Sequence, residues 1–157
     1  MNALTQTYFG KLLCTFFLSM VPVVELRGGI PLGLSLGLSP MDSFLCATLG
    51  NMLPVPFLIL LTRRVFAWLK RSPRLAPFIE KLERRGHEKG DLVRKYSTPG
   101  LIILVAIPLP GTGAWTGALV ATLLNLRLKT AIPAILLGVL IAGGLVLAAS
   151  MGFIAIF

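Results

Sequence analysis

The sequence predicts an all-α integral membrane protein, built as an inverted repeat of a re-entrant helical hairpin followed by a transmembrane helix. The 157 residues are 55% hydrophobic and only 13% charged, whereas a soluble domain carries about 25% charged residues. The apolar residues form long blocks, at roughly 2–24, 28–62, 98–126 and 130–157. Each block is near or above the roughly 17–25 residues that cross a hydrocarbon core. We therefore treat residues 1–157 as a single membrane domain.

An internal repeat divides the chain into two similar parts, at 6–63 and 96–150. A shift of 88 residues places apolar blocks on apolar blocks without a gap. It also aligns four pairs of identical residues at or near the breaks between the blocks, namely Tyr8 with Tyr96, Pro22 with Pro110, Gly29 with Gly117 and Gly50 with Gly138.

Each repeat begins with two short apolar arms around a break rich in proline and glycine. The first arms lie at 8–21 and 96–109. Each arm has about 10–14 residues, or about 15–21 Å of helix, which is too short to cross a core of about 30 Å. The pattern therefore predicts a hairpin that enters the membrane and returns to the same side. A longer helix that crosses the membrane is expected next, at roughly 41–63 and 129–150.

The segment between the repeats, residues 64–95, is predicted to be cytoplasmic. Of the 15 basic residues, 11 lie between Arg63 and Lys95, together with four of the six acidic residues. Basic residues that flank membrane segments stay on the cytoplasmic side. We therefore expect a multi-pass protein of the inner or plasma membrane.

Two topologies fit these blocks. Four plain transmembrane helices would place the connection at 125–129 outside, whereas re-entrant hairpins place it inside, so that the cytoplasm receives 13 of the 15 basic residues. One crossing per repeat also inverts the second copy relative to the first, as in many secondary transporters. We favour the re-entrant topology.

Glu25 and Arg27 lie in the first break, inside an apolar block of more than 30 residues. A charge at bilayer depth is costly unless it is paired or reaches water, so the two residues indicate a substrate and ion site at the hairpin tip. Glu25 would carry a proton and Arg27 would bind an anionic group. Gly28 and Gly29 are expected to unwind the backbone and to precede a helix N-terminus that faces the same group. The alternative is a structural Glu25–Arg27 bridge that only fixes the hairpin.

The second break, at 108–117, carries no charge. Gly113 permits close approach of the backbone, while Thr112 and Thr116 offer hydroxyls beside another helix N-terminus. Trp115 would line a substrate path or fill space. The alternative is that these small residues only let the two hairpins pack closely.

Several classes of function lack their motifs in this sequence. There is no Walker loop, HExxH, nucleophile elbow or CxxC pair, so we expect neither an enzyme nor an ATP-driven pump, and no metal or cofactor. Cys14 and Cys46 are interpreted as apolar packing residues. The formal net charge of +9 is explained by topology, and we expect no nucleic-acid partner.

The motifs PVVELRGGIPLG at 22–33 and PLPGTGAWTG at 108–117 resemble those of the small multidrug export protein family of bacterial and archaeal membranes. The resemblance covers nearly the whole chain. That family is similar to the DedA/VTT superfamily, whose members have two oppositely oriented re-entrant hairpins and include proton-coupled lipid transporters and scramblases. The resemblance implies that Glu25 and Arg27 are the functional charges of the first hairpin. DedA members tend to carry an arginine in the second hairpin motif, and this chain has none there.

These observations lead to a hypothesis of function. We expect a small secondary transporter or lipid translocator, coupled to protons through Glu25, that moves a small amphipathic or anionic lipid-like substrate. The alternative is a non-transporting membrane scaffold whose hairpins organise lipid or partner proteins. Membrane lipids are expected partners in either case, and so short a chain is expected to pair with a second copy of itself to enclose a pathway.

Overall fold

The computed structural model describes residues 7–69, 77, 90–109 and 112–156, with the side chains of 69, 90–96 and 154–156 left out of the description. The described chain is helical and contains no strand. Its elements are α1 (Tyr8–Met20), α2 (Glu25–Ser35), α3 (Pro40–Met52), α4 (Pro54–Leu69), α6 (Gly90–Ala106), α7 (Ala114–Leu123) and α8 (Leu128–Ile156). The prediction of an all-helical chain is confirmed.

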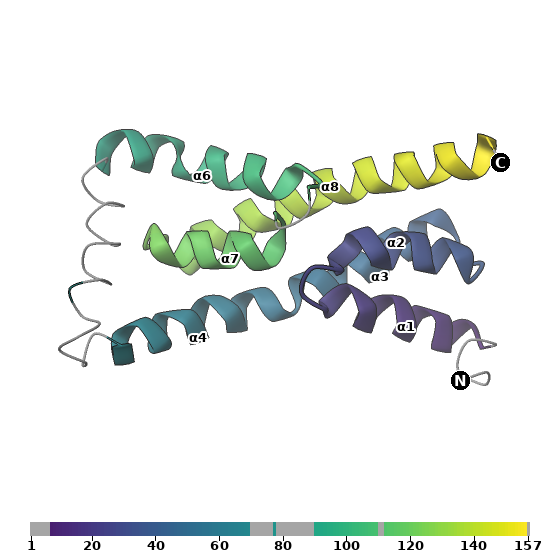
Figure 1. Cartoon of the computed structure of the whole chain (residues 1–157), viewed down its shortest axis with the longest axis horizontal. Coiled ribbons are helices and arrows are strands. Elements are labelled where there is room, and N and C mark those ends of the chain that lie inside the picture. Colours follow the sequence, from purple (N-terminus) through teal and green to yellow (C-terminus); the bar gives the residue numbers. More distant parts are fainter. Residues whose placement is uncertain (1–6, 70–76, 78–89, 110–111, 157) are drawn as a thin grey trace.

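Two helical segments in the described part are long and apolar enough to cross a membrane. The first, Pro40–Trp68, joins α3 and α4 over 29 residues, and the second is the Leu128–Phe153 part of α8, with 26 residues. At 1.5 Å per residue both are about 40 Å long, more than a hydrocarbon core of about 30 Å. They pack against each other and run in opposite directions along the molecule (Figure 1). These are the two crossing helices that the sequence predicts.

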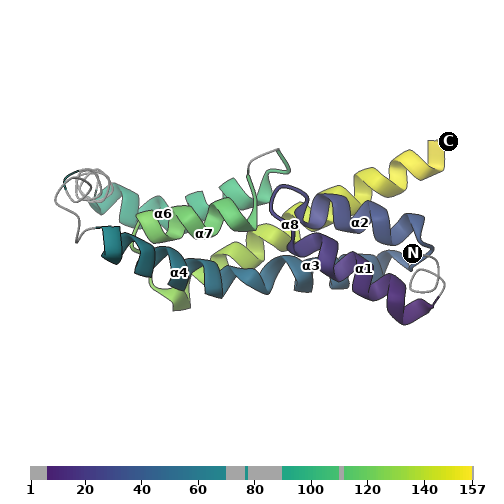
Figure 2. The same cartoon turned by 60° about the horizontal axis from the view of Figure 1, so that its bottom comes forward.

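The α1–α2 and α6–α7 hairpins lie along opposite halves of the two long segments (Figures 1 and 2). The first hairpin packs on α3, and the second packs on α4 and α8. The connection from α1 to α2 and the connection from α6 to α7 face each other near the middle of the molecule. Since α1, α2 and α7 have 13, 11 and 10 residues, their lengths of about 15–20 Å agree with the expected short arms.

Local sequence explains where these arms begin and end. The α1 helix ends at Met20, two residues before Pro22, because a residue that precedes proline is driven out of the helical region. After α2, Gly37 adopts a positive φ of 80°. Ser39 then caps α3, accepting the Asp42 N–H at 3.1 Å, and Pro40 takes the first helical position.

Small residues fill the interface between the first hairpin and α3. A Cβ at Gly29 would overlap Ser19 of α1 and lie 3.3 Å from Cβ of Ala47 in α3. A Cβ at Gly50 would overlap the backbone carbonyl of Phe16. Close backbone approach through glycine, alanine and serine is the usual way in which helices pack in a bilayer, where apolar side chains gain little from leaving lipid.

The second hairpin is packed in the same manner. A Cβ at Gly117 would lie 2.6 Å from Val105 of α6 and 3.4 Å from Ile135 of α8, and one at Gly138 would lie 2.9 Å from the carbonyl of Ile102. The surface outside these interfaces is rich in apolar side chains, with Phe9, Phe17, Phe57, Leu61 and Phe153 each more than half exposed. This is the surface expected of a protein whose solvent is lipid.

One expectation about the first break is wrong. The sequence suggested that Gly28 and Gly29 unwind the backbone, but both lie inside α2, which is helical from Glu25 to Ser35. The irregular backbone lies between the end of α1 and Glu25, where Val23 has a φ of 75° and Glu25 itself has a φ of 48°. The two glycines serve packing instead, because Gly29 must fit between Ser19 and Ala47.

Candidate functional site

Glu25 lies where the connections of the two hairpins meet. It is the first residue of α2 and is only 4% exposed. Its Oε1 accepts the backbone N–H of Trp115 at 3.2 Å, and the backbone N–H of Ala114 lies near the same carboxylate. These N–H groups open α7 and have no partner within that helix. The carboxylate therefore lies at the positive end of the α7 dipole.

Two backbone positions are specialised for this contact. Glu25 has a φ of 48° and Gly113 has a φ of 142°, and non-glycine residues rarely adopt such angles. A Cβ at Gly113 would overlap the Glu25 carboxylate. Glycine at this position is therefore required both by the backbone angle and by the close approach of Glu25.

Arg27 contacts the other side of the second connection. Its guanidinium donates to the backbone carbonyls of Ile107, at 3.3 Å, and of Leu109 and Thr112. It also donates to the Thr112 hydroxyl at 2.9 Å. The Ile107 carbonyl follows directly on α6, so the positive charge lies at the negative end of that helix.

The two opposite charges thus use their hydrogen bonds on the second hairpin rather than on each other. Glu25 holds the start of α7 and Arg27 holds the end of α6. Sequence reasoning weighed a local Glu25–Arg27 bridge that fixes the first hairpin. In the structure the same residues instead connect one hairpin to the other.

The predicted site residues separate into two groups. Glu25, Arg27, Thr112, Gly113 and the backbone of Trp115 come together at this contact.

Gly28 faces Val24, while Gly29 is part of the packing against α3. Thr116 is half-buried in the first turn of α7, and the indole N–H of Trp115 is buried without a partner among the described residues. Pro110 and Gly111 of the second motif lie outside the described residues.

Sequence reasoning missed the acceptors that bind Arg27. They are backbone carbonyls of Ile107, Leu109 and Thr112. Because every residue has a carbonyl, no residue type in the sequence marks these three as acceptors. The prolines of the second motif, Pro108 and Pro110, were the available signal, because proline interrupts the helical bonding around it and leaves carbonyls free.

Two membrane-length helices and two short hairpins that meet at the buried Glu25 and the half-buried Arg27 define this chain as a helical membrane protein. Comparison with known proteins identifies it further. The chain belongs to the family described as "putative small multi-drug export protein", which it matches over residues 25–145. That family description points to membrane export rather than to an enzyme, and it confirms the resemblance found in the sequence motifs. Neither the curated proteins nor the solved structures that were compared give a match.

Proposed function

We propose that the protein is a small secondary transporter, coupled to protons through Glu25, that exports a small amphipathic or anionic lipid-like substrate. The observation that carries this proposal is the contact between the two hairpin connections, where Glu25 and Arg27 bind opposite ends of α7 and α6. Ends of short helices at mid-membrane form the binding sites of many secondary transporters.

We also propose that both hairpins are re-entrant. Arg63, near the end of α4, donates to the backbone carbonyl of Leu126 in the α7–α8 connection. Four plain transmembrane helices would place these two residues at opposite membrane surfaces, so their contact supports the re-entrant topology. With 64–95 in the cytoplasm, the second hairpin enters from the cytoplasm and the first from the opposite side.

An inverted repeat is supported by the glycines that the repeat pairs. Gly29 packs between α1 and Ala47, and Gly117 packs between α6 and Ile135. Ala47 and Ile135 are themselves separated by the repeat shift of 88 residues. Contacts that repeat with the same spacing as the glycines favour duplication over chance similarity.

The proposed mechanism makes the contact a gate. A proton on a Glu25 oxygen removes the charge that attracts the N–H groups of α7, and an anionic group of the substrate competes with the Leu109 and Thr112 carbonyls for Arg27. Each event weakens the link between the hairpins, and the two together let the hairpins separate and change the side from which the site is reached. Release of both restores the contact.

Transport by purified protein in lipid vesicles tests this proposal. A pH-sensitive dye inside the vesicles reports proton movement when fluorescent amphipaths are added outside. Glu25→Gln should abolish coupled proton movement, and Arg27→Ala should abolish uptake of anionic amphipaths, both without loss of folded protein. Asp42→Asn and Arg64→Ala, which change a half-buried and an exposed charge away from the contact, should transport normally. Undiminished coupled transport by Glu25→Gln would contradict the proposal.

A membrane scaffold is the second candidate, because the hydrogen bonds of Glu25 and Arg27 already connect the two hairpins. In that case Glu25→Gln and Arg27→Ala lower the stability of the protein before they alter any flux. Unfolding and transport measured on the same preparations therefore separate the two functions.

A further inference from the structure

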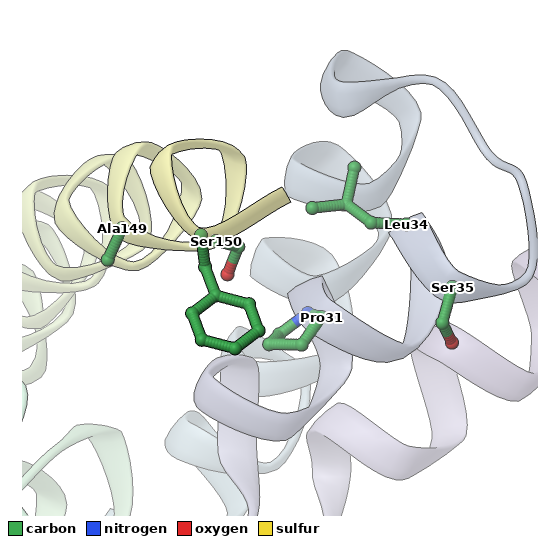
Figure 3. Close-up of a pocket in the computed structure, with 6 residues that line it drawn as sticks. Pro31, Leu34, Ser35, Ala149 and Ser150 are labelled. Atoms are coloured by element: carbon green, nitrogen blue, oxygen red, sulfur yellow. The ribbon is translucent and has the colours of Figure 1, made fainter. Parts of the chain in front are cut away.

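A pocket of about 460 Å³ lies between α2 and the last turns of α8 (Figure 3). It is lined by Pro31, Leu34, Ser35, Ala149, Ser150 and Phe153. Both hydroxyls are bonded within their own helices, Ser35 to the Leu32 carbonyl at 2.8 Å and Ser150 to the Val146 carbonyl at 2.8 Å. The wall therefore offers mainly apolar surface.

The pocket shares a face of α2 with Arg27. Pro31 and Leu34 follow Arg27 by four and seven residues, the spacing of one helix face, so they lie about 6–11 Å further along the axis. Pro31 has no N–H and cannot bond the carbonyl of Arg27. One face of α2 thus carries polar groups at its inner end and an apolar hollow beyond them.

The charge that a ligand reaches at the inner end is positive. Glu25 is only 4% exposed, with its carboxylate turned to the α7 N–H groups, whereas Arg27 is only half-buried. The volume is also that of a site for a single drug-sized molecule. A cation at one end and an apolar hollow at the other complement one anionic group joined to one apolar chain.

We propose that this groove binds the apolar chain of a single-chain anionic amphipath whose head group binds Arg27. The inference rests on the proposed function, since it assigns a substrate class to the same site. The chain occupies the space between Leu34 and Ala149, and the head group displaces the carbonyls that now bind the guanidinium.

Photolabelling in phosphatidylcholine nanodiscs tests the assignment. The probes are a fatty acid with a diazirine on its chain and the matching fatty alcohol, and mass spectrometry locates the labelled peptides. The acid should label the α2 and α8 segments around the pocket. Unlabelled fatty acids should compete with the labelled acid for the groove.

Variants of the pocket supply the controls. Ala149→Trp and Leu34→Trp fill the groove from its two sides and should reduce labelling at least tenfold. Met151→Trp, at a half-exposed position of α8 two residues from both Ala149 and Phe153 and therefore on another face of the helix, should leave labelling unchanged. Arg27→Gln should reduce labelling by the acid to the level of the alcohol, which it should not affect.

Three results overturn the inference. The first is equal labelling of Ala149→Trp, Leu34→Trp and Met151→Trp, and the second is equal labelling by the acid and the alcohol in the wild-type protein. The third is stronger labelling by a photoactivatable phosphatidylglycerol. The last would assign the groove to bilayer lipid. Labelling does not require turnover. If Glu25→Gln transports normally while the groove labels as expected, the proposed gate fails and the binding site stands. If Glu25→Gln stops transport and the groove does not label, only the binding site fails.

Discussion

Gly113→Ala is the substitution that tests the contact between the hairpins most directly. Two penalties apply at this position. The backbone angles, φ 142° and ψ −163°, belong to a region that is almost restricted to glycine, and a residue with a Cβ there costs about 1–3 kcal/mol. The added Cβ also overlaps the Glu25 carboxylate, which must move away from the N–H groups of α7. Loss of hydrogen bonds to a charged group costs about 1.5–3 kcal/mol. We expect a loss of about 2.5–6 kcal/mol in the free energy of unfolding.

Unfolding of the purified protein by SDS in mixed micelles, followed by circular dichroism, measures this loss. Gly144→Ala is the matched control, because a Cβ at that position in α8 meets nothing within 4 Å. Alanine also favours a helix over glycine by about 1 kcal/mol, so the control should be neutral or slightly more stable.

A double-mutant cycle then isolates the contact. In a Glu25→Ala background no carboxylate remains to be displaced, so Gly113→Ala should cost only its backbone strain, about 1–3 kcal/mol. If Gly113→Ala is as stable as the wild-type protein, or costs the same with and without Glu25, the carboxylate does not lie against the start of α7 and the reasoning is refuted.

Three further predictions concern packing and topology. Gly50→Ala should destabilise the protein by roughly 2 kcal/mol or more, because its Cβ overlaps the backbone of Phe16. Gly100→Ala is the control, because its Cβ meets nothing within 4 Å. Equal stability of the two variants in an SDS titration would contradict this packing. Arg63→Ala should lower the free energy of unfolding by about 0.6–1.7 kcal/mol, because it removes the donor to the Leu126 carbonyl. The same SDS titration measures this loss, and Arg64→Ala, at an exposed position, is the control. In a background without Cys14 and Cys46, a cysteine at position 127 should react with an impermeant thiol reagent only after permeabilisation, while one at position 40 reacts in intact cells; external labelling at 127 would restore the four-helix topology.

The helices could be predicted closely because their signals are local. Proline and glycine end the arms, and Pro40 and Ser39 mark the start of the first crossing segment. The first arm of the second repeat was placed at 96–109, but α6 begins at Gly90. The residues between include Asp91, Arg94 and Lys95, and these charges interrupt the apolar pattern. Hydrophobic blocks therefore underestimate a helix that continues out of the membrane.

The site was predictable in part. Charges in an apolar block singled out Glu25 and Arg27, and glycine with threonine singled out the second break. The sequence did not predict that each charge binds the opposite hairpin, because its partners are backbone groups of Trp115 and Leu109. Such pairing depends on where two connections meet in space, and periodicity carries no information on that distance.

The strength of the proposed gate follows from the kind of partner that each charge has. A helix end carries about half an elementary charge, so the partners of Glu25 and Arg27 compensate their cost of burial only in part. An anionic head group carries a full charge and can replace the end of α6 at Arg27, and a proton can replace the start of α7 at Glu25. If Glu25 and Arg27 bound each other, each full charge would be compensated within the first hairpin. A proton or an anionic head group would then compete for them less easily. Pairing each charge with a helix end instead keeps the contact stable enough to close and weak enough for a substrate and a proton to open.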